Sequence, residues 1–169
     1  KERDCSVLFG DGAGAVVLTE GNAFKDVKLT MISDRDVLYY ERGMEPTPFQ
    51  EKYIVGQPLV MRGKELFRTA VTESAKDIQA LLKRNDLQSD DIDWFMLHQA
   101  NKRIIEGIRN IVGGPVAKYP PIIEKYGNTS SASIPIMLDE MIADDKIKDG
   151  EKIVMSAFGA GFVSAACLW

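Results

Sequence analysis

The chain has 169 residues, of which 45% are hydrophobic and 27% are charged, a composition typical of globular proteins. Its 21 Lys and Arg residues against 25 Asp and Glu residues give a formal charge of −4, which argues against a general nucleic-acid-binding protein, since these are normally basic. The two cysteines cannot form a disulfide framework, and no apolar run approaches the ~20 residues of a membrane helix, so we expect a cytoplasmic protein without a membrane segment.

The first third of the chain has the pattern of short strands separated by turns. Buried strands are predicted over residues 6–9 and 15–19, and the glycine-rich residues 10–14 between them are predicted to form a tight strand-to-strand turn. Polar and apolar residues alternate over 27–32, as in a half-buried strand. Residues 33–58 contain several prolines and glycines, which predicts a long irregular segment of the kind that is often functional or mobile.

Helical periodicity begins after Gly63. Apolar residues recur at helical spacing from Leu66 to Leu82, so a helix is predicted there. A short buried strand over 94–97 ends immediately before His98, and a second helix is predicted over about 101–112.

The last part of the chain predicts a short helical turn, a third helix and two strands. The helical turn covers residues 120–125, and Ser131 or Ser133 can cap the third helix, whose first turn accommodates Pro135. The strands cover 152–158 and 162–168 and are joined by glycines.

This order of elements predicts an α/β unit with a mixed five-stranded sheet and flanking helices. The chain begins without Met, close to its first apolar run, and ends within a predicted strand. We therefore expect residues 1–169 to be one domain of a longer protein.

His98 is the only histidine, and it is the first candidate for acid–base chemistry near neutral pH. It follows a predicted strand and begins a polar cluster, and ligands of α/β proteins collect at the carboxyl ends of strands. A lone histidine is also commonly a structural residue, and at this point both alternatives are open.

Two loops and the cysteines offer weaker signals. Asn128 can donate its side-chain amide N–H to a developing oxyanion, or it can belong to an ordinary turn that leads into a helix. The glycines of residues 158–162 can expose a backbone N–H to a ligand, or they can form a simple hairpin turn. Cys5 lacks a local activating feature, and Cys167 has the pattern of strand packing.

Four segments become specific when they are taken together. They are Gly10-Asp-Gly-Ala-Gly-Ala15, His98-Gln-Ala-Asn101, Gly127-Asn-Thr-Ser-Ser131 and Phe158-Gly-Ala-Gly-Phe162, in this order. The combination resembles the carboxyl-terminal half of β-ketoacyl-acyl-carrier-protein synthase III, in the thiolase-like superfamily, and the resemblance covers essentially the whole chain. It implies one half of a five-layered αβαβα fold, with the amino-terminal half absent.

The resemblance also implies a function. Such enzymes are homodimeric, cytoplasmic acyltransferases that initiate fatty acid synthesis by a decarboxylative Claisen condensation. Their partners are acyl-CoA and malonyl-acyl-carrier protein, with the coenzyme A thioester as a substrate and with no cofactor and no metal. Nucleic acid and membrane partners are not expected.

Individual roles follow from the same resemblance. His98 and Asn128 match the histidine and asparagine of a catalytic Cys-His-Asn set, and the backbone N–H of Ala160 matches an oxyanion hole. Neither cysteine matches the nucleophile, so this chain alone is expected to be inactive. Substrate binding is implied for Arg3, Gly63, Ala100, Asn101, Phe9, Leu59 and Phe158. Docking of the carrier protein is implied for Arg103, Arg68, Lys102 and Arg109.

Several alternatives remain at the level of the sequence. The apolar residues implied for the acyl pocket could equally well belong to an ordinary hydrophobic core. The basic residues implied for docking could equally well form a solvent-exposed helix face. The segment 45–50 departs from the family pattern, which leaves the acyl-chain preference open. The whole protein could also be a relative that primes polyketides or transfers acyl groups elsewhere, or a non-catalytic partner subunit with the same fold.

Overall fold

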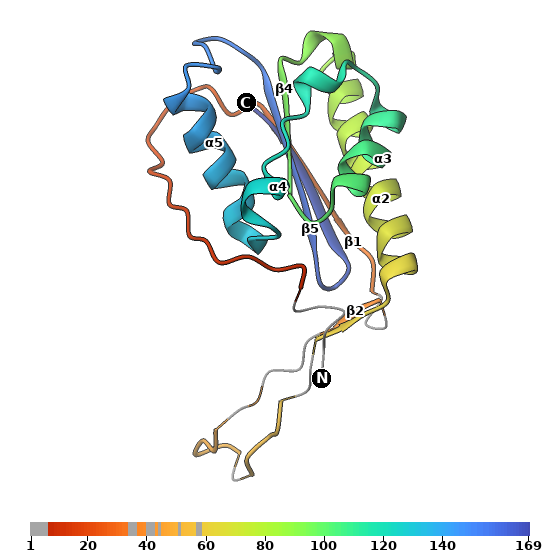
Figure 1. The fold of residues 1–169 in the computed structure, drawn as a ribbon, viewed down its shortest axis with the longest axis vertical. Coiled ribbons are helices and arrows are strands. Elements are labelled where there is room, and N and C mark those ends of the chain that lie inside the picture. The colour runs from red at the N-terminus through yellow and green to blue at the C-terminus, as the bar shows by residue number, and fades with distance from the viewer. Residues whose placement is uncertain (1–6, 34–36, 40–42, 44, 51, 57–58) are drawn as a thin grey trace.

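A four-stranded mixed sheet forms the centre of the molecule in a computed structural model that describes residues 7–33, 37–39, 43, 45–50, 52–56 and 59–169 (Figure 1). The strand order is β1 (Asp26–Met31), β6 (Val163–Leu168), β5 (Ile153–Gly159) and β4 (Trp94–Leu97). β4 pairs with β5 in parallel, and the other pairs are antiparallel. The predicted mixed α/β sheet with flanking helices is thus confirmed, with four strands rather than five among the described residues.

Helices flank both faces of this sheet (Figure 1). α2 (Gly63–Arg84) and α3 (Lys102–Val112) lie on one side, while α4 (Ile123–Tyr126) and α5 (Ser133–Ala143) lie on the other. The remaining elements are short: the two-stranded ladder of β2 (Leu38–Tyr39) with β3 (Val60–Met61), and the 3₁₀ turns η1 (Ser89–Asp91), η2 (Val116–Lys118) and η3 (Ser130–Ala132). Among the described residues, no helix combines the length and the apolar character needed to cross a membrane.

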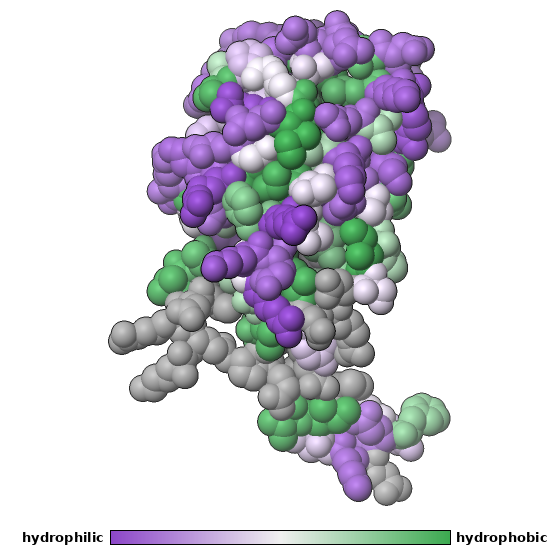
Figure 2. All heavy atoms as spheres, turned by 90° about the vertical axis from the view of Figure 1, so that its right-hand side faces the viewer, coloured by the Kyte–Doolittle hydropathy of each residue, from purple (hydrophilic) through white to green (hydrophobic). Residues whose placement is uncertain are grey.

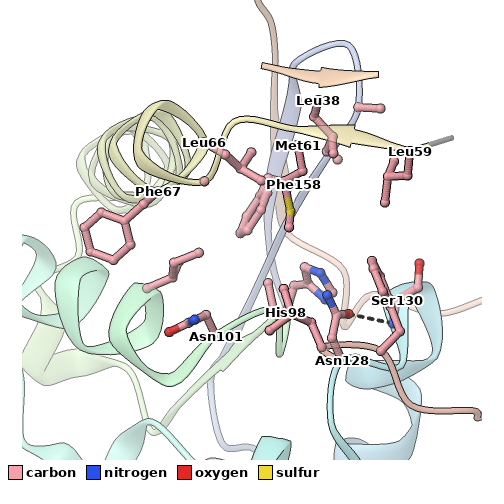
Figure 3. Close-up of a pocket in the computed structure, with 17 residues that line it drawn as sticks. Leu38, Leu59, Met61, Leu66, Phe67, His98, Asn101, Asn128, Ser130 and Phe158 are labelled. Atoms are coloured by element: carbon pink, nitrogen blue, oxygen red, sulfur yellow. Dashed lines mark hydrogen bonds between the residues drawn. The ribbon is translucent and has the colours of Figure 1, made fainter. Parts of the chain in front are cut away.

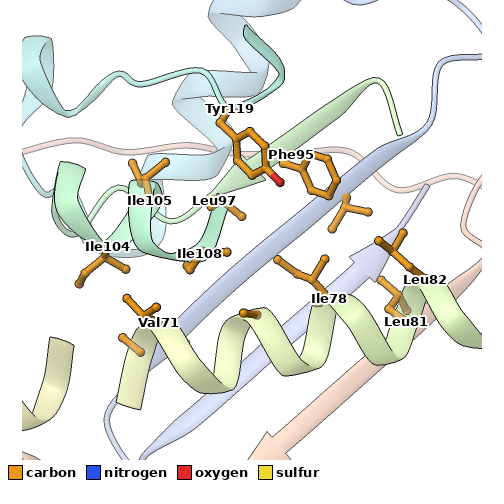
Figure 4. Packing of buried hydrophobic residues seen from close by; sticks show 14 of the residues in the cluster. Val71, Ile78, Leu81, Leu82, Phe95, Leu97, Ile104, Ile105, Ile108 and Tyr119 are labelled. Carbon is orange, nitrogen blue, oxygen red and sulfur yellow. The ribbon is translucent and has the colours of Figure 1, made fainter. Parts of the chain in front are cut away.

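The larger hydrophobic core lies between the sheet and the helices α2 and α3 (Figure 4). The helical spacing of apolar residues in α2 places Val71, Ile78 and Leu82 on the face toward the sheet. Phe95 stacks on Tyr119, with ring centroids 4.6 Å apart. A second cluster, which includes buried methionines of β4 and α5, fills the other side of the sheet.

A buried carboxylate fixes α2 on the sheet. Asp77 is almost completely buried and accepts hydrogen bonds of 2.6 Å from the hydroxyl groups of Thr30 on β1 and Ser164 on β6. Because a buried carboxylate is costly without partners, these two bonds specify how the helix lies across the two strands.

β1 confirms the predicted alternation, but its apolar side chains face outward. Val27, Leu29 and Met31 are exposed, and the exposed fraction of Leu29 is 65%. Lys28 and Thr30 are half-buried on the side of α2. No helix of the described chain covers this apolar face of β1, so it presents an unusual solvent-facing hydrophobic stripe.

The two strands predicted near the start of the chain are wrong for the described residues. Residues 7–25 contain no strand, and the segment runs past α5 as an extended trace in which Val17 is 91% exposed (Figure 1). A strand exists only when its backbone groups find a partner, and among the described residues the segment finds a single parallel bridge, between Phe9 and Asn128.

The glycines of residues 10–14 do not form the predicted strand-to-strand turn, and they allow a close contact between two chain segments instead. A Cβ on Gly10 would lie 1.8 Å from the carbonyl oxygen of Tyr126, and one on Gly14 would lie 2.3 Å from the side chain of Pro135. The glycines therefore allow this extended segment to lie directly against residues 126–135.

The predicted cap of α5 is also wrong. The helix follows η3, Ala132 occupies the N-cap position without a side-chain hydrogen bond, and Ser133 is the first helical residue. Because the preceding 3₁₀ turn already leads into the helix, neither Ser131 nor Ser133 is needed as a cap. The hydroxyl of Ser133 contacts His98 and Gln99 instead.

Candidate active site

A cavity of about 520 Å³ opens where β4 ends (Figure 3). Its wall combines the extended segment at the start of the chain, the β2–β3 ladder, the first turns of α2 and α3, the loop before α5 and the β5–β6 turn. The lining residues are mainly apolar, with a few polar groups among them, a composition typical of ligand sites. The polar side chains of the lining are His98, Asn101, Asn128 and Ser130.

β4 delivers His98 to this cavity. The apolar run Trp94–Leu97 forms the strand, and the backbone N–H of His98 continues its pairing by donating to the Ser156 carbonyl oxygen over 2.8 Å. The imidazole contacts the ring of Phe158 edge-on, with centroids 5.3 Å apart, and its Nδ1 lies 2.8 Å from the hydroxyl oxygen of Ser133.

Burial determines the charge of His98. Desolvation lowers the pKa of the imidazole from 6.5 to about 4, so the side chain is neutral near pH 7. A neutral imidazole can donate a hydrogen bond from one nitrogen without delivering a full proton, which suits it to stabilising a developing anion.

The backbone of Asn128 is clamped by the extended segment. Its N–H donates to the Leu8 carbonyl oxygen, and its own carbonyl oxygen accepts from the Gly10 N–H, both over 3.0 Å. Because Gly10 cannot carry a side chain at this point, the close approach of two chain segments places Asn128 at the cavity wall.

The side-chain carbonyl of Asn128 is used within the loop. Its Oδ1 accepts a 2.9 Å hydrogen bond from the backbone N–H of Ser130, drawn as a dashed line in Figure 3. Ser130 itself has a φ of +52°, in the left-handed region that few residues other than glycine adopt. The amide NH₂ is then the polar group that Asn128 can offer to a ligand in the cavity.

The structure brings together nine of the residues singled out in the sequence. They are Phe9, Leu59, Gly63, His98, Ala100, Asn101, Asn128, Phe158 and Ala160, which all line the cavity. Asn101 also forms the N-cap of α3, since its Oδ1 accepts a 2.9 Å bond from the Arg103 N–H. Arg3 and Cys5 lie outside the described residues.

Sequence reasoning missed about half of the lining. The additional residues are Leu8, Leu38, Met61, Leu66, Phe67, Ile104, Ser130 and Gly159. The first turns of α2 and α3 were predictable places to search, because helices that follow strands begin at the edge of the sheet where ligands bind. Leu38 lies within the predicted irregular segment, and Met61 lies just after it. Both belong to the short β2–β3 ladder, and neither is part of a periodic apolar pattern.

The four basic residues proposed for docking have different surroundings. The Arg103 guanidinium lies 5.8 Å from the centre of the Phe67 ring, whereas Lys102 forms a 2.5 Å ion pair with Glu124. Arg109 donates to Asn110, and Arg68 is exposed on α2. Figure 2 faces the side of the molecule that carries α2 and α3, and hydrophilic side chains cover much of it.

The lowered pKa of His98 predicts a pH-dependent stability. Between pH 6.5 and about 4 the unfolded chain binds a proton that the folded chain excludes, so the His98 contribution to the free energy of unfolding is complete above pH 6.5 and is lost as the pH falls toward 4. We expect this loss to reach roughly 2–3 kcal/mol by pH 4.5. Urea unfolding at pH 7.5 and pH 4.5 measures it, with His98→Gln as the control that lacks a titrating ring. Equal pH dependence in both proteins would contradict the prediction.

Comparisons with known proteins show what the chain as a whole is similar to. The family model for the C-terminal part of 3-oxoacyl-[acyl-carrier-protein (ACP)] synthase III matches residues 82–169, just over half of the chain. A β-ketoacyl-[acyl-carrier-protein] synthase III from Halalkalibacterium halodurans is 38% identical over 99% of this chain and 51% of its own length. The chain spans about half the length of the curated relatives it matches.

Solved structures extend the comparison to the fold. The crystal structure of 3-oxoacyl-[acyl-carrier-protein] synthase III from Aquifex aeolicus matches with a TM-score of 0.84 and 32% identity, over 99% of this chain and 52% of that one. The priming β-ketosynthase of the R1128 polyketide biosynthetic pathway matches with a TM-score of 0.79 and 27% identity, over 99% of this chain and 51% of that one. The predicted thiolase-like fold is confirmed.

Proposed function

The chain belongs to the 3-oxoacyl-[acyl-carrier-protein] synthase III family, and on that premise we propose that the protein containing it condenses an acyl-CoA with malonyl-acyl-carrier protein to initiate fatty acid synthesis. The observation that carries the proposal is the cavity that His98 and Asn128 share. One polar atom of each side chain is engaged within the protein, the His98 Nδ1 by the Ser133 hydroxyl and the Asn128 Oδ1 by the Ser130 N–H. The other nitrogen of each side chain is the group that we propose serves a ligand.

We propose that residues 1–169 form the carboxyl-terminal half of a two-half catalytic unit. The relatives are about twice as long, and the chain leaves apolar surface uncovered on β1 and along residues 16–18. A second half that covers these surfaces and supplies the nucleophilic cysteine accounts for both observations. The complete protein then forms a homodimer and acts in the cytoplasm.

The first half-reaction loads the enzyme. The thiolate of the cysteine in the other half attacks the thioester carbon of acyl-CoA, coenzyme A leaves as its thiolate, and the acyl group remains on the cysteine. Phe9, Leu59 and Phe158 would form the apolar wall for the acyl chain, and Gly63, Ala100 and Asn101 the path of the pantetheine arm. The absence of a side chain at Gly63 leaves open space beside this path.

The second half-reaction places negative charge on an oxygen. When the malonyl group loses CO₂, the electron pair of the broken C–C bond forms a thioester enolate, and the His98 Nε2–H and the Asn128 Nδ2–H donate to its oxygen. The enolate carbon then attacks the acyl-cysteine carbonyl, the backbone N–H of Ala160 holds the tetrahedral oxyanion, and expulsion of the cysteine thiolate releases the β-ketoacyl-carrier protein. Preorganised donors of this kind contribute about 3–4 kcal/mol each to the transition state.

Carrier-protein docking gives a separate prediction. If the acidic carrier protein binds beside the cavity mouth, Arg103→Glu is expected to raise the KM for malonyl-acyl-carrier protein about tenfold and to leave the KM for acyl-CoA unchanged. The reason is that a charge at the rim of an interface mainly affects the encounter with the charged partner. Steady-state kinetics with both substrates varied provides the measurement. Lys83→Glu in the last turn of α2, at the end of the helix remote from the cavity, is the matched charge reversal. Equal effects of both variants would contradict docking at Arg103.

The function itself is tested by product analysis. The full-length protein, given acyl-CoA and malonyl-acyl-carrier protein, is expected to release CO₂ and to form a β-ketoacyl-carrier protein that mass spectrometry detects. Release of coenzyme A without CO₂ would contradict the condensation.

One comparison favours a second candidate. The likeness to a priming β-ketosynthase of a polyketide pathway makes polyketide priming the main alternative. Competition between acyl-carrier proteins of fatty acid and polyketide type, with the same acyl-CoA, separates the two functions. A non-catalytic partner subunit would instead lack a cysteine in the other half and would form no acyl-enzyme.

A further inference from the structure

We propose that Ser133 is a positioning residue that holds His98 in the tautomer with its proton on Nε2 and directs that N–H into the cavity. The consequence for catalysis rests on the proposed function, since it requires His98 to act as the donor to the enolate oxygen. The assignment of the tautomer rests on the contacts of Ser133 alone.

The hydroxyl of Ser133 has two partners. It is 1% exposed, and its Oγ lies 2.8 Å from the His98 Nδ1 and 3.3 Å from the backbone nitrogen of Gln99. A backbone N–H only donates, so Oγ is the acceptor in the bond with Gln99. Its own hydrogen needs an acceptor, and among the described residues the Nδ1 of His98 is the one that it reaches.

These contacts decide where the imidazole proton lies. If Nδ1 carried it, the Ser133 hydroxyl hydrogen would be buried without an acceptor, which is unfavourable. With the proton on Nε2, the Ser133 hydroxyl donates to the His98 Nδ1 and accepts from the Gln99 N–H, so all three groups have a hydrogen-bond partner. The neutral ring, which its burial favours, therefore presents its N–H on the side away from Ser133.

The position of Ser133 in the chain couples the two donors of the site. It lies five residues after Asn128 in one short segment, so the same loop supplies one donor and orients the other. Gln99 strengthens this connection, because its fully buried side chain donates to the Leu97 carbonyl oxygen over 2.8 Å and accepts from the Ile122 N–H over 3.0 Å. The end of β4 and the loop that precedes Asn128 are thereby held at a fixed spacing.

Nuclear magnetic resonance tests the tautomer directly. In the full-length protein labelled with ¹⁵N-histidine, the signals that disappear in His98→Gln belong to His98. Without substrate, we expect an unprotonated Nδ1 and a protonated Nε2. A wild-type His98 protonated on Nδ1 would overturn the proposal, and this result does not depend on whether any Ser133 variant folds.

Kinetics tests the positioning role. Ser133→Ala is expected to mix the two tautomers in the same spectrum and to lower malonyl decarboxylation roughly tenfold, the effect of one lost buried hydrogen bond, with the rate of cysteine acylation unchanged. Ser133→Thr keeps the hydroxyl and is expected to restore both readouts. Ser74→Ala is the matched control, since Ser74 is equally buried and its hydroxyl has no partner among the described residues.

The outcomes separate this proposal from the proposed function. A Ser133→Ala protein that matches the wild type in both spectrum and decarboxylation, or a Ser133→Thr protein as impaired as Ser133→Ala, contradicts the role of the hydroxyl. A wild-type protein that shows the Nε2–H tautomer yet releases no CO₂ contradicts the condensing function and leaves the tautomer assignment intact.

Discussion

Replacing His98 or Asn128 by alanine in the full-length protein is expected to lower malonyl decarboxylation by about 10²–10³-fold while cysteine acylation largely survives. The reason is that, in the proposed mechanism, both side chains act where negative charge appears. The enolate oxygen exists only in the decarboxylation step, and the acylation step places its charge at the oxyanion hole assigned to Ala160. The two half-reactions therefore respond differently to the same variant.

The double variant sharpens this prediction. Donors that serve one oxygen act as a unit, so His98→Ala with Asn128→Ala together should cost much less than the product of the two single effects. The release of CO₂ from malonyl-acyl-carrier protein and the mass of the acyl-enzyme measure the two steps separately. Fully multiplicative losses would indicate that the two side chains contribute independently to decarboxylation, against a coupled pair of donors at one oxygen.

The second large effect is expected at Gly10, which touches no substrate in the proposed mechanism. A Cβ at this position would lie 1.8 Å from the Tyr126 carbonyl oxygen and 3.0 Å from its carbon, both backbone atoms that cannot rotate away. Gly10→Ala must therefore displace the extended segment and break the bond from the Gly10 N–H to the Asn128 carbonyl oxygen. Because this bond places Asn128 at the cavity, we expect decarboxylation to fall at least tenfold and the free energy of unfolding to fall by about 1–3 kcal/mol.

Gly21 provides the matched control for this prediction. It lies in the same extended segment, but a Cβ there meets nothing within 4 Å. Decarboxylation rates and thermal unfolding of Gly10→Ala and Gly21→Ala give the comparison. If the two variants behave alike, the close approach of Gly10 to residues 126–128 does not position Asn128.

The sequence was most informative where local pattern and tertiary packing agree. The apolar periodicity of Leu66 to Leu82 predicts α2, since those residues form the face that packs on the sheet. The run before His98 predicts β4, and the end of that strand predicts the place of the site. The four motifs led to His98, Asn128 and Ala160, which lie far apart in the sequence and all line the cavity.

The sequence failed where a partner decides the outcome. Residues 15–19 have strand-forming side chains, but a strand needs a neighbouring backbone, and none of the described elements supplies it. The alternation of β1 was visible, yet it could not reveal that Val27, Leu29 and Met31 face away from α2.

Ser133 illustrates a further limit. Its position before an apolar helical segment favours a cap, and only the three-dimensional arrangement shows that its hydroxyl binds His98 and Gln99 instead. Interactions between residues 34 or 35 positions apart leave no trace in the local pattern of a single sequence.

In the proposed mechanism Asn128, with His98, donates to the enolate oxygen formed by decarboxylation. Asn128→Asp tests it most directly, because the aspartate keeps an oxygen for the Ser130 N–H but replaces the donor NH₂ by an acceptor. In one reaction of the full-length variant, acyl-enzyme mass and CO₂ release are recorded together. We predict normal acylation and CO₂ release reduced at least 10²-fold, whereas lost acylation with undiminished CO₂ release would contradict the account.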